Sequence, residues 1–222
     1  MNTDLLTAAA ALHPTSAGYA LVYGSHAIHP RPTSDLDLLY TGNRPLAPDR
    51  LAQLIYDVKH LHAEHDLTLD EEVSYTTKLY ATSAEIESAA RLDGFIGVSG
   101  YATPVGDPQM LNSPAFKRRL LLNALTTPHL FLTGDVHTYR RHVAKAERGC
   151  ALLALRIAGA GKIRLADATG ALLASPEGLT EKRFLGYRPG PHLYAVLRRG
   201  LADLAHEHLV HLDHDAITWR PT

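Results

Sequence analysis

Apolar residues in the first half of the chain recur with helical spacing in three segments. Residues 3–12 are rich in alanine and leucine and begin with Thr3 and Asp4, either of which can cap a helix. Residues 48–65 begin with proline and carry apolar side chains three and four positions apart. Residues 83–92 open with serine and have glutamates near the start, as in a capped helix. The pattern predicts three helices.

Between these segments the apolar residues predict strands. Residues 18–23 form a short apolar run opened by glycine. In residues 34–40, Leu36 and Leu38 alternate with Asp35 and Asp37, as in a strand with one buried face. Residues 66–75 contain alternating leucines followed by acidic residues and predict a third strand, which would carry Asp70 and Glu72.

The pattern changes at residues 98–114, which are rich in glycine and proline and indicate a boundary. Helical spacing dominates beyond it, in residues 113–125, 135–159 and 192–212. Residues 163–186 carry turn residues and predict a loop or a small hairpin. The fold class expected is therefore α+β, with a mixed sheet flanked by helices in residues 1–105 and a mainly helical second domain in residues 106–222.

Composition narrows the possible partners. Lys and Arg number 22 against 23 Asp and Glu, so no global charge favours a nucleic acid or an anionic membrane. No apolar run reaches the roughly 20 residues that span a bilayer.

Cys150 is the only cysteine and sits among alanines and leucines, so we expect a buried structural thiol and no internal disulfide. Since the N-terminus shows no charged-then-apolar leader, the expected location is the cytoplasm.

The candidate chemistry lies where the first two predicted strands meet. Asp35 and Asp37 are two positions apart, so on a strand they would project from the same face. Two close carboxylates repel unless they share a proton or a cation, and hard oxygen ligands suit Mg²⁺. Gly24 and Ser25, at the end of the preceding strand, offer a hydroxyl and closely approachable backbone N–H groups to a phosphate. The aspartate pair and the glycine-serine pair together fit one substrate, a nucleoside triphosphate with its metal ion.

The segment "GSHAIHPRPTSDLDLLY", residues 24–40, resembles the signature of the DNA polymerase beta type nucleotidyltransferase superfamily, in particular its small bacterial members and the aminoglycoside nucleotidyltransferases. The resemblance implies a third carboxylate on a neighbouring strand, with Asp70 as first choice and Glu72 as second. Small members often carry arginine three residues after the serine, where this chain has Ile28. Arg31 is the candidate substitute for that phosphate contact, with Arg44 as the second choice.

The resemblance implies an enzyme that transfers a nucleoside monophosphate to a hydroxyl and releases pyrophosphate. Asp35, Asp37 and the third carboxylate would hold two Mg²⁺ ions, and the third carboxylate would act as general base. Gly24, Ser25 and Arg31 would bind the triphosphate, with ATP expected. A small acceptor such as an aminoglycoside or another antibiotic is favoured over RNA or protein. The alternatives are transfer to protein or RNA, as in toxin and antitoxin systems, and an inactive nucleotide-binding regulatory module.

Other polar residues are expected to have no part in the chemistry. Lys78 could contact a phosphate, but a solvated lysine is favoured. The basic stretches at residues 116–119 and 139–142 predict solvated helix faces. The histidines between residues 206 and 214 include an i, i+3 pair, which could lie on one helix face. We expect these histidines to lie on the surface at the end of a final helix and not to form a zinc site.

Overall fold

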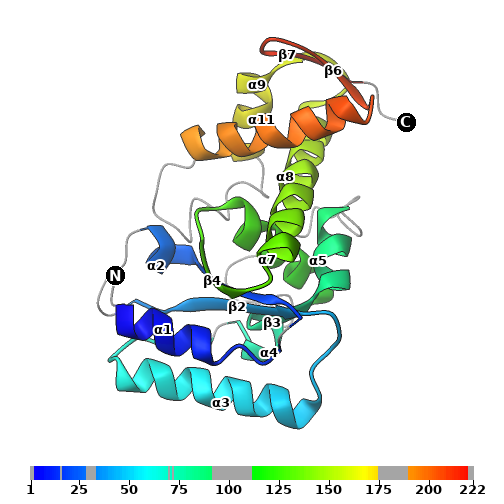
Figure 1. The fold of residues 1–222 in the computed structure, drawn as a ribbon. Coiled ribbons are helices and arrows are strands. Elements are labelled where there is room, and N and C mark those ends of the chain that lie inside the picture. The colour runs from blue at the N-terminus through cyan, green and yellow to red at the C-terminus, as the bar shows by residue number, and fades with distance from the viewer. Residues whose placement is uncertain are drawn as a thin grey trace.

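The computed structural model describes residues 3–15, 17–28, 34–69, 71, 73–91, 112–174 and 190–219. Within these residues the protein is α+β, with a four-stranded mixed sheet, a small three-stranded sheet and long helices between them (Figure 1). The mixed sheet lies at the N-terminal end of the molecule, and α8 leads from it to the small sheet (Figure 1).

The mixed sheet has the strand order β3-β2-β1-β4. The strands are β1 (Tyr19–Tyr23), β2 (Asp37–Gly42), β3 (Tyr80–Thr82) and β4 (Leu130–Gly134). β1 is antiparallel to both β2 and β4, whereas β2 and β3 are parallel. Tyr23, the last residue of β1, pairs with Asp37, the first residue of β2. This register places the end of one strand beside the start of the next, where the candidate site begins.

One face of the sheet is covered by α1 (Thr3–Ala11) and α3 (Pro48–Glu64), which lie together below the sheet in Figure 1. Their apolar residues form one buried cluster with the sheet and with α4 (Tyr75–Lys78). Val58 of α3 and Val22 of β1 are both fully buried in it. The helical spacing of residues 48–65 is thus explained by burial of one face of α3 against the strands.

The opposite face of the sheet packs against α5 (Ser83–Ala90), α7 (Pro114–Thr126) and α8 (Val136–Ala158). These helices and the sheet share a second buried cluster, which continues along α8 to the far end of the molecule. That end contains β5 (Gly161–Arg164), α9 (Leu165–Ala174), α11 (Gly190–His206), β6 (Val210–Asp213) and β7 (Ala216–Trp219). The small sheet has the order β5-β7-β6 with antiparallel neighbours.

Capping residues set several helix ends where the sequence predicts them. The Ser113 side chain accepts a hydrogen bond from the Phe116 N–H, and proline follows Ser113 at the start of α7. The long helix α8 ends at Gly159, which has φ of 91°. α5 is capped one residue earlier than its serine suggests, because Thr82 forms a capping box with Glu85.

The structure corrects several predictions from the pattern. The third strand predicted over residues 66–75 is wrong, because the described residues there form no strand and the neighbour of β2 is β3, which lies later in the chain. β4 follows the glycine- and proline-rich segment but pairs with β1 in the mixed sheet. Residues 163–174 form the end of β5 and all of α9, whereas the last predicted helix stops at His206 and a strand hairpin follows.

Within the described part of the chain, no helix is both long enough and apolar enough to cross a membrane.

Candidate functional site

The candidate site is built around a contact between Gly24 and Asp37. Gly24 follows β1 directly and opens α2 (Gly24–Ile28) with φ of +68°, a conformation that L side chains rarely adopt. A Cβ at this position would lie 2.1 Å from Oδ2 of Asp37. The carboxylate of Asp37 therefore rests against the glycine backbone, and partly exposed Ser25 follows directly. Glycine is required here both by its backbone angle and by the carboxylate.

His26 ties α2 to the segment that leads into β2. Its side chain is buried, and its Nδ1 lies 2.8 Å from the backbone oxygen of Asp35 and 3.0 Å from Oγ of Ser34. A short helix after β1 thus holds the backbone at the first aspartate, while Gly24 contacts the second. The glycine-serine turn and the aspartate pair are one structural unit.

Asp35 precedes β2, and its carboxylate contacts two buried polar side chains. Oδ1 lies 2.9 Å from Nε2 of His62, and Oδ2 lies 3.4 Å from Nζ of Lys78. His62 is 0% and Lys78 5% exposed, whereas the Asp35 side chain is 15% exposed. The Lys78 ammonium also stands over the Tyr75 ring, 4.6 Å from its centroid. Asp35 is therefore the most exposed member of a polar cluster that it forms with the buried side chains of His62 and Lys78.

The surroundings of Asp35 favour its ionised form. Burial by itself would raise its pKa, but the hydrogen bond with His62 and the positive charge of Lys78 outweigh burial and lower the pKa below its ordinary value. Asp35 is accordingly a carboxylate at neutral pH, as a ligand for a divalent cation must be.

The ring of His62 is held at both nitrogens. Nδ1 lies 2.8 Å from the backbone oxygen of Val58, one turn earlier in α3. Nε2 lies beside Asp35 and also 3.2 Å from the Leu36 backbone N–H. Nδ1 therefore faces a backbone oxygen, whereas Nε2 lies within hydrogen-bond distance of both a carboxylate oxygen and the Leu36 N–H, to which it is an acceptor.

The structure brings Gly24, Ser25, Asp35 and Asp37 into one region of the molecule, as the sequence predicts. The prediction that both aspartates lie on a strand is wrong for Asp35, because β2 starts at Asp37. Their alternation with buried leucines nevertheless holds, since Leu36 and Leu38 are buried and both aspartates are partly exposed. The predicted residues Arg31, Asp70 and Glu72 lie outside the described residues.

The sequence patterns do not identify His26 and His62 as residues of the site, and they give the wrong environment for Lys78. It predicts a solvated lysine at position 78, and the structure buries it against Asp35. His62 has a usable signal, because it lies four residues after Val58 and so falls on the apolar face of α3. A polar residue on such a face needs a buried partner, and Asp35 is that partner.

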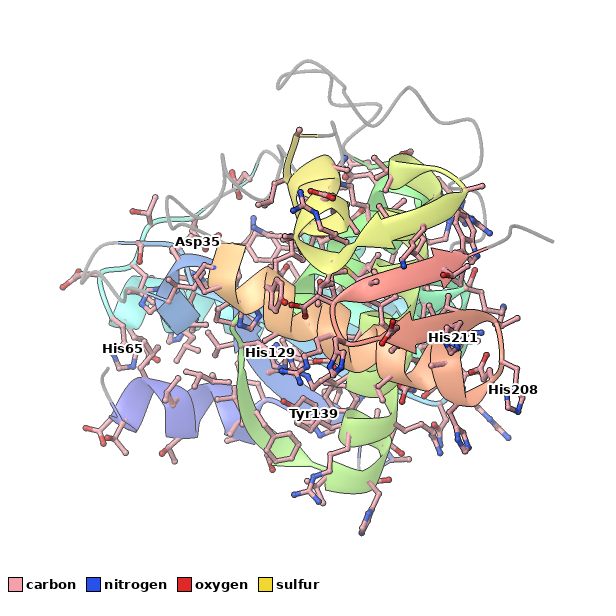
Figure 2. The ribbon with its side chains drawn as sticks, turned by 90° about the horizontal axis from the view of Figure 1, so that it is seen from above. Asp35, His65, His129, Tyr139, His208 and His211 are labelled. Carbon is pink, nitrogen blue, oxygen red and sulfur yellow. The ribbon has the colours of Figure 1, made fainter. Side chains whose placement is uncertain are left out.

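The terminal histidines lie far from this region. His208 and His211 are at the opposite side of the molecule from Asp35 in Figure 2. They do not share a helix face, because His208 follows α11 in a turn and His211 is in β6. Among the described residues no group of three or more histidine, cysteine or acidic side chains could hold a metal ion.

The two aspartates fit part of a Mg²⁺ site. Carboxylate oxygens are the hard ligands that Mg²⁺ prefers, and it commonly binds through one or two of them together with substrate phosphates. Each oxygen of Asp35 makes one of the contacts described above, and a carboxylate oxygen has two acceptor directions. Asp37 supplies a second, partly exposed carboxylate. By donor type, the two aspartates therefore suit a cation held by two protein ligands plus a phosphate.

Comparisons with models of protein families, with curated proteins and with solved structures gave no match to this chain.

Proposed function

We propose that the protein is a metal-dependent nucleotidyltransferase, which moves a nucleoside monophosphate from a nucleoside triphosphate to a hydroxyl of an acceptor and releases pyrophosphate. The observation that carries the proposal is the contact between Gly24 and the Asp37 carboxylate. It joins a strand–glycine–serine turn, which suits phosphate, to an aspartate pair, which suits Mg²⁺. The resemblance of residues 24–40 to nucleotidyltransferases supports the same pairing.

The residues of the site have separate tasks in this proposal. Asp35 and Asp37 hold the cations, and Ser25 orients the terminal phosphates beside Gly24. When bound there, Mg²⁺ would supply positive charge that stabilises the triphosphate and the attacking oxygen. One of the predicted third carboxylates, Asp70 or Glu72, accepts the proton of the acceptor hydroxyl. Because phosphoryl-type transfer depends mostly on positioning and charge, these few groups suffice for the reaction.

For the acceptor we propose a small molecule with a hydroxyl group, of the aminoglycoside or another antibiotic class. The near-neutral net charge of -1 supports a small acceptor over RNA. We place its binding determinants in residues 106–222, since in this proposal Ser25, Asp35 and Asp37 would hold the metal and the phosphates.

The proposal is tested by pyrophosphate release. The purified protein is incubated with Mg²⁺ and each of the four ribonucleoside triphosphates, with aminoglycosides or bulk tRNA as acceptors. Asp35→Asn and Asp37→Asn remove one ligand charge each, and Asp57→Asn on α3, away from these contacts, is the matched control. We expect acceptor-dependent release that falls at least about 100-fold in both site variants and is unchanged in the control. Equal release by wild type and both site variants would refute the proposal.

One observation favours a second candidate, a nucleotide-binding module without turnover. The ammonium of Lys78 lies 3.4 Å from Oδ2 of Asp35, where it already neutralises part of the carboxylate charge. In such a module Asp35→Asn would leave triphosphate binding unchanged. Calorimetric titration with a non-hydrolysable triphosphate, with and without Mg²⁺, separates the candidates, because a transferase requires Mg²⁺ and the aspartates for tight binding.

A further inference from the structure

His62 is the buried group behind Asp35. It lies near the end of α3, is fully buried, and belongs to neither the glycine-serine turn nor the aspartate pair. Its Nε2 is 2.9 Å from Oδ1 of Asp35, whereas Lys78 contacts Oδ2. Both oxygens of the carboxylate are thus contacted by buried side chains, and His62 holds Oδ1.

The ring of His62 cannot turn without losing contacts. Its Nδ1 lies 2.8 Å from the oxygen of Val58, which is itself fully buried. The helix therefore fixes the ring at one nitrogen, and the other nitrogen is aimed at Asp35. In metal sites the ligating carboxylates are themselves hydrogen-bonded to neighbouring groups, and these partners orient them.

We infer that His62 is a positioning residue for Asp35, which orients the carboxylate toward a bound divalent cation; this inference rests on the metal site of the proposed function. His62 itself does not touch the metal or the substrate. It restricts Asp35 to one rotamer, so that less conformational freedom is lost when the cation binds.

Two substitutions separate this role from a merely structural one. The amide nitrogen of glutamine takes the place of Nε2, so His62→Gln keeps a donor to Asp35. The amide of asparagine takes the place of Nδ1, so His62→Asn keeps the contact with Val58 and loses the one with Asp35. His60→Gln, on the exposed side of the same helix, is the matched control.

The readout is binding of Mn²⁺, measured from the electron paramagnetic resonance signal of the free ion in the presence of a non-hydrolysable triphosphate. We expect the Kd to rise at least about tenfold in His62→Asn, as is typical when a partner of a metal ligand is removed. In His62→Gln the increase in Kd should be much smaller than tenfold, and in His60→Gln the Kd should equal that of wild type. A Kd in His62→Asn equal to that of wild type would overturn the inference.

A second measurement does not depend on the folding of a variant. In the wild-type protein, the ¹⁵N resonance of His62 Nε2 should shift when Mg²⁺ saturates the site, whereas the resonances of His60 should not. Saturable binding without a shift at His62 would overturn the inference but leave the metal site intact. Absence of any saturable binding of Mn²⁺ or Mg²⁺ by the wild-type protein would instead overturn the proposed function, and the inference with it.

Discussion

The α-carbon of Gly24 lies against the carboxylate of Asp37, so closely that a Cβ at position 24 would come within 2.1 Å of Oδ2. Gly24 follows the end of β1 and Asp37 begins β2, and the two strands pair at this point. The glycine thereby lets a carboxylate approach the turn after β1. Its replacement should affect both the backbone and the position of Asp37.

Gly24→Ala should destabilise the protein and abolish the metal-dependent activity proposed above. A residue with a Cβ at this positive φ costs about 1–2 kcal/mol, and the methyl group would also displace the Asp37 side chain. Urea denaturation should therefore show a loss of about 2 kcal/mol or more. Gly170→Ala is the control, because Gly170 lies in α9 with open space where the added methyl group would go. That variant should equal or slightly exceed wild-type stability, and equal losses in both would contradict the explanation.

Lys78→Met should destabilise the protein much more than Lys59→Met. Both ammonium groups stand over the Tyr75 ring, Lys78 at 4.6 Å and Lys59 at 5.3 Å. Lys78 is buried beside Asp35, whereas the side chain of Lys59 is 40% exposed and pairs with Glu71 on the surface. We expect a loss of about 2 kcal/mol or more for Lys78→Met because a partly buried carboxylate loses a counter-ion. An exposed pair contributes less than about 1 kcal/mol.

Equilibrium urea denaturation of the two lysine variants measures this difference. Adding about 1 M NaCl should reduce the effect of Lys59→Met, because salt screens exposed charges, and should leave most of the effect of Lys78→Met. Equal losses in the two variants would show that the burial of Lys78 has no energetic consequence.

His142 should make the protein less stable in mild acid. Its side chain is fully buried in α8, with Nδ1 3.1 Å from Oη of Tyr19, and its Nε2 has no hydrogen-bond partner among the described residues. Burial, followed by the nearby charge of Arg141, lowers the pKa of His142 from 6.5 to about 4. The unfolded chain therefore takes up a proton at this site before the folded protein does, and stability falls as the pH drops from about 6.5 to about 4.

The contribution of His142 to this pH dependence is roughly 3 kcal/mol over the whole window, from the size of the shift. His142→Phe should flatten the plot of unfolding free energy against pH between about 4 and 6.5. His137→Gln, in the exposed first turn of α8, should follow wild type. A plot for His142→Phe parallel to that of wild type would disprove the assignment.

Arg199→Met should loosen the packing of α11 on α8, whereas Arg198→Met should not. Arg199 donates from Nε and Nη2 to the carboxylate of buried Glu147, with the shortest contact at 2.7 Å. The neighbouring Arg198 is exposed. Since the Arg199 side chain is itself half-exposed, we expect a loss of about 1–2 kcal/mol, measured by thermal unfolding. A loss as large in Arg198→Met would mean that general surface charge, rather than this pair, is responsible.

The pattern of apolar residues predicts the helices better than the strands. In α3 the apolar face is long enough for its spacing to be unambiguous, and proline marks its start. At residues 66–75 only Leu67 and Leu69 alternate, and Leu69 is exposed in the structure. Alternation over so few residues does not distinguish a strand from an extended loop. β3 is shorter still, and only its pairing with β2 defines it.

The sequence predicts the candidate site where local spacing defines it and misses it where distant segments meet. Asp35 and Asp37 lie beside Gly24 because β1 and β2 are neighbours in both sequence and sheet. His62 and Lys78 reach Asp35 from α3 and α4, and no local pattern shows which helix end faces a given residue. A lysine is rarely buried, so its burial could not be expected from residue type.

The buried cluster that runs from Tyr19 in β1 to Trp219 in β7 also bears on how the protein can be handled. A fragment ending at residue 105 would lack β4 and would leave apolar side chains of β1 in water, so it should aggregate instead of folding as an independent domain. Cys150 lies inside the same cluster. Its thiol is therefore a native reporter, because a thiol reagent can modify it only as fast as this shared interior opens.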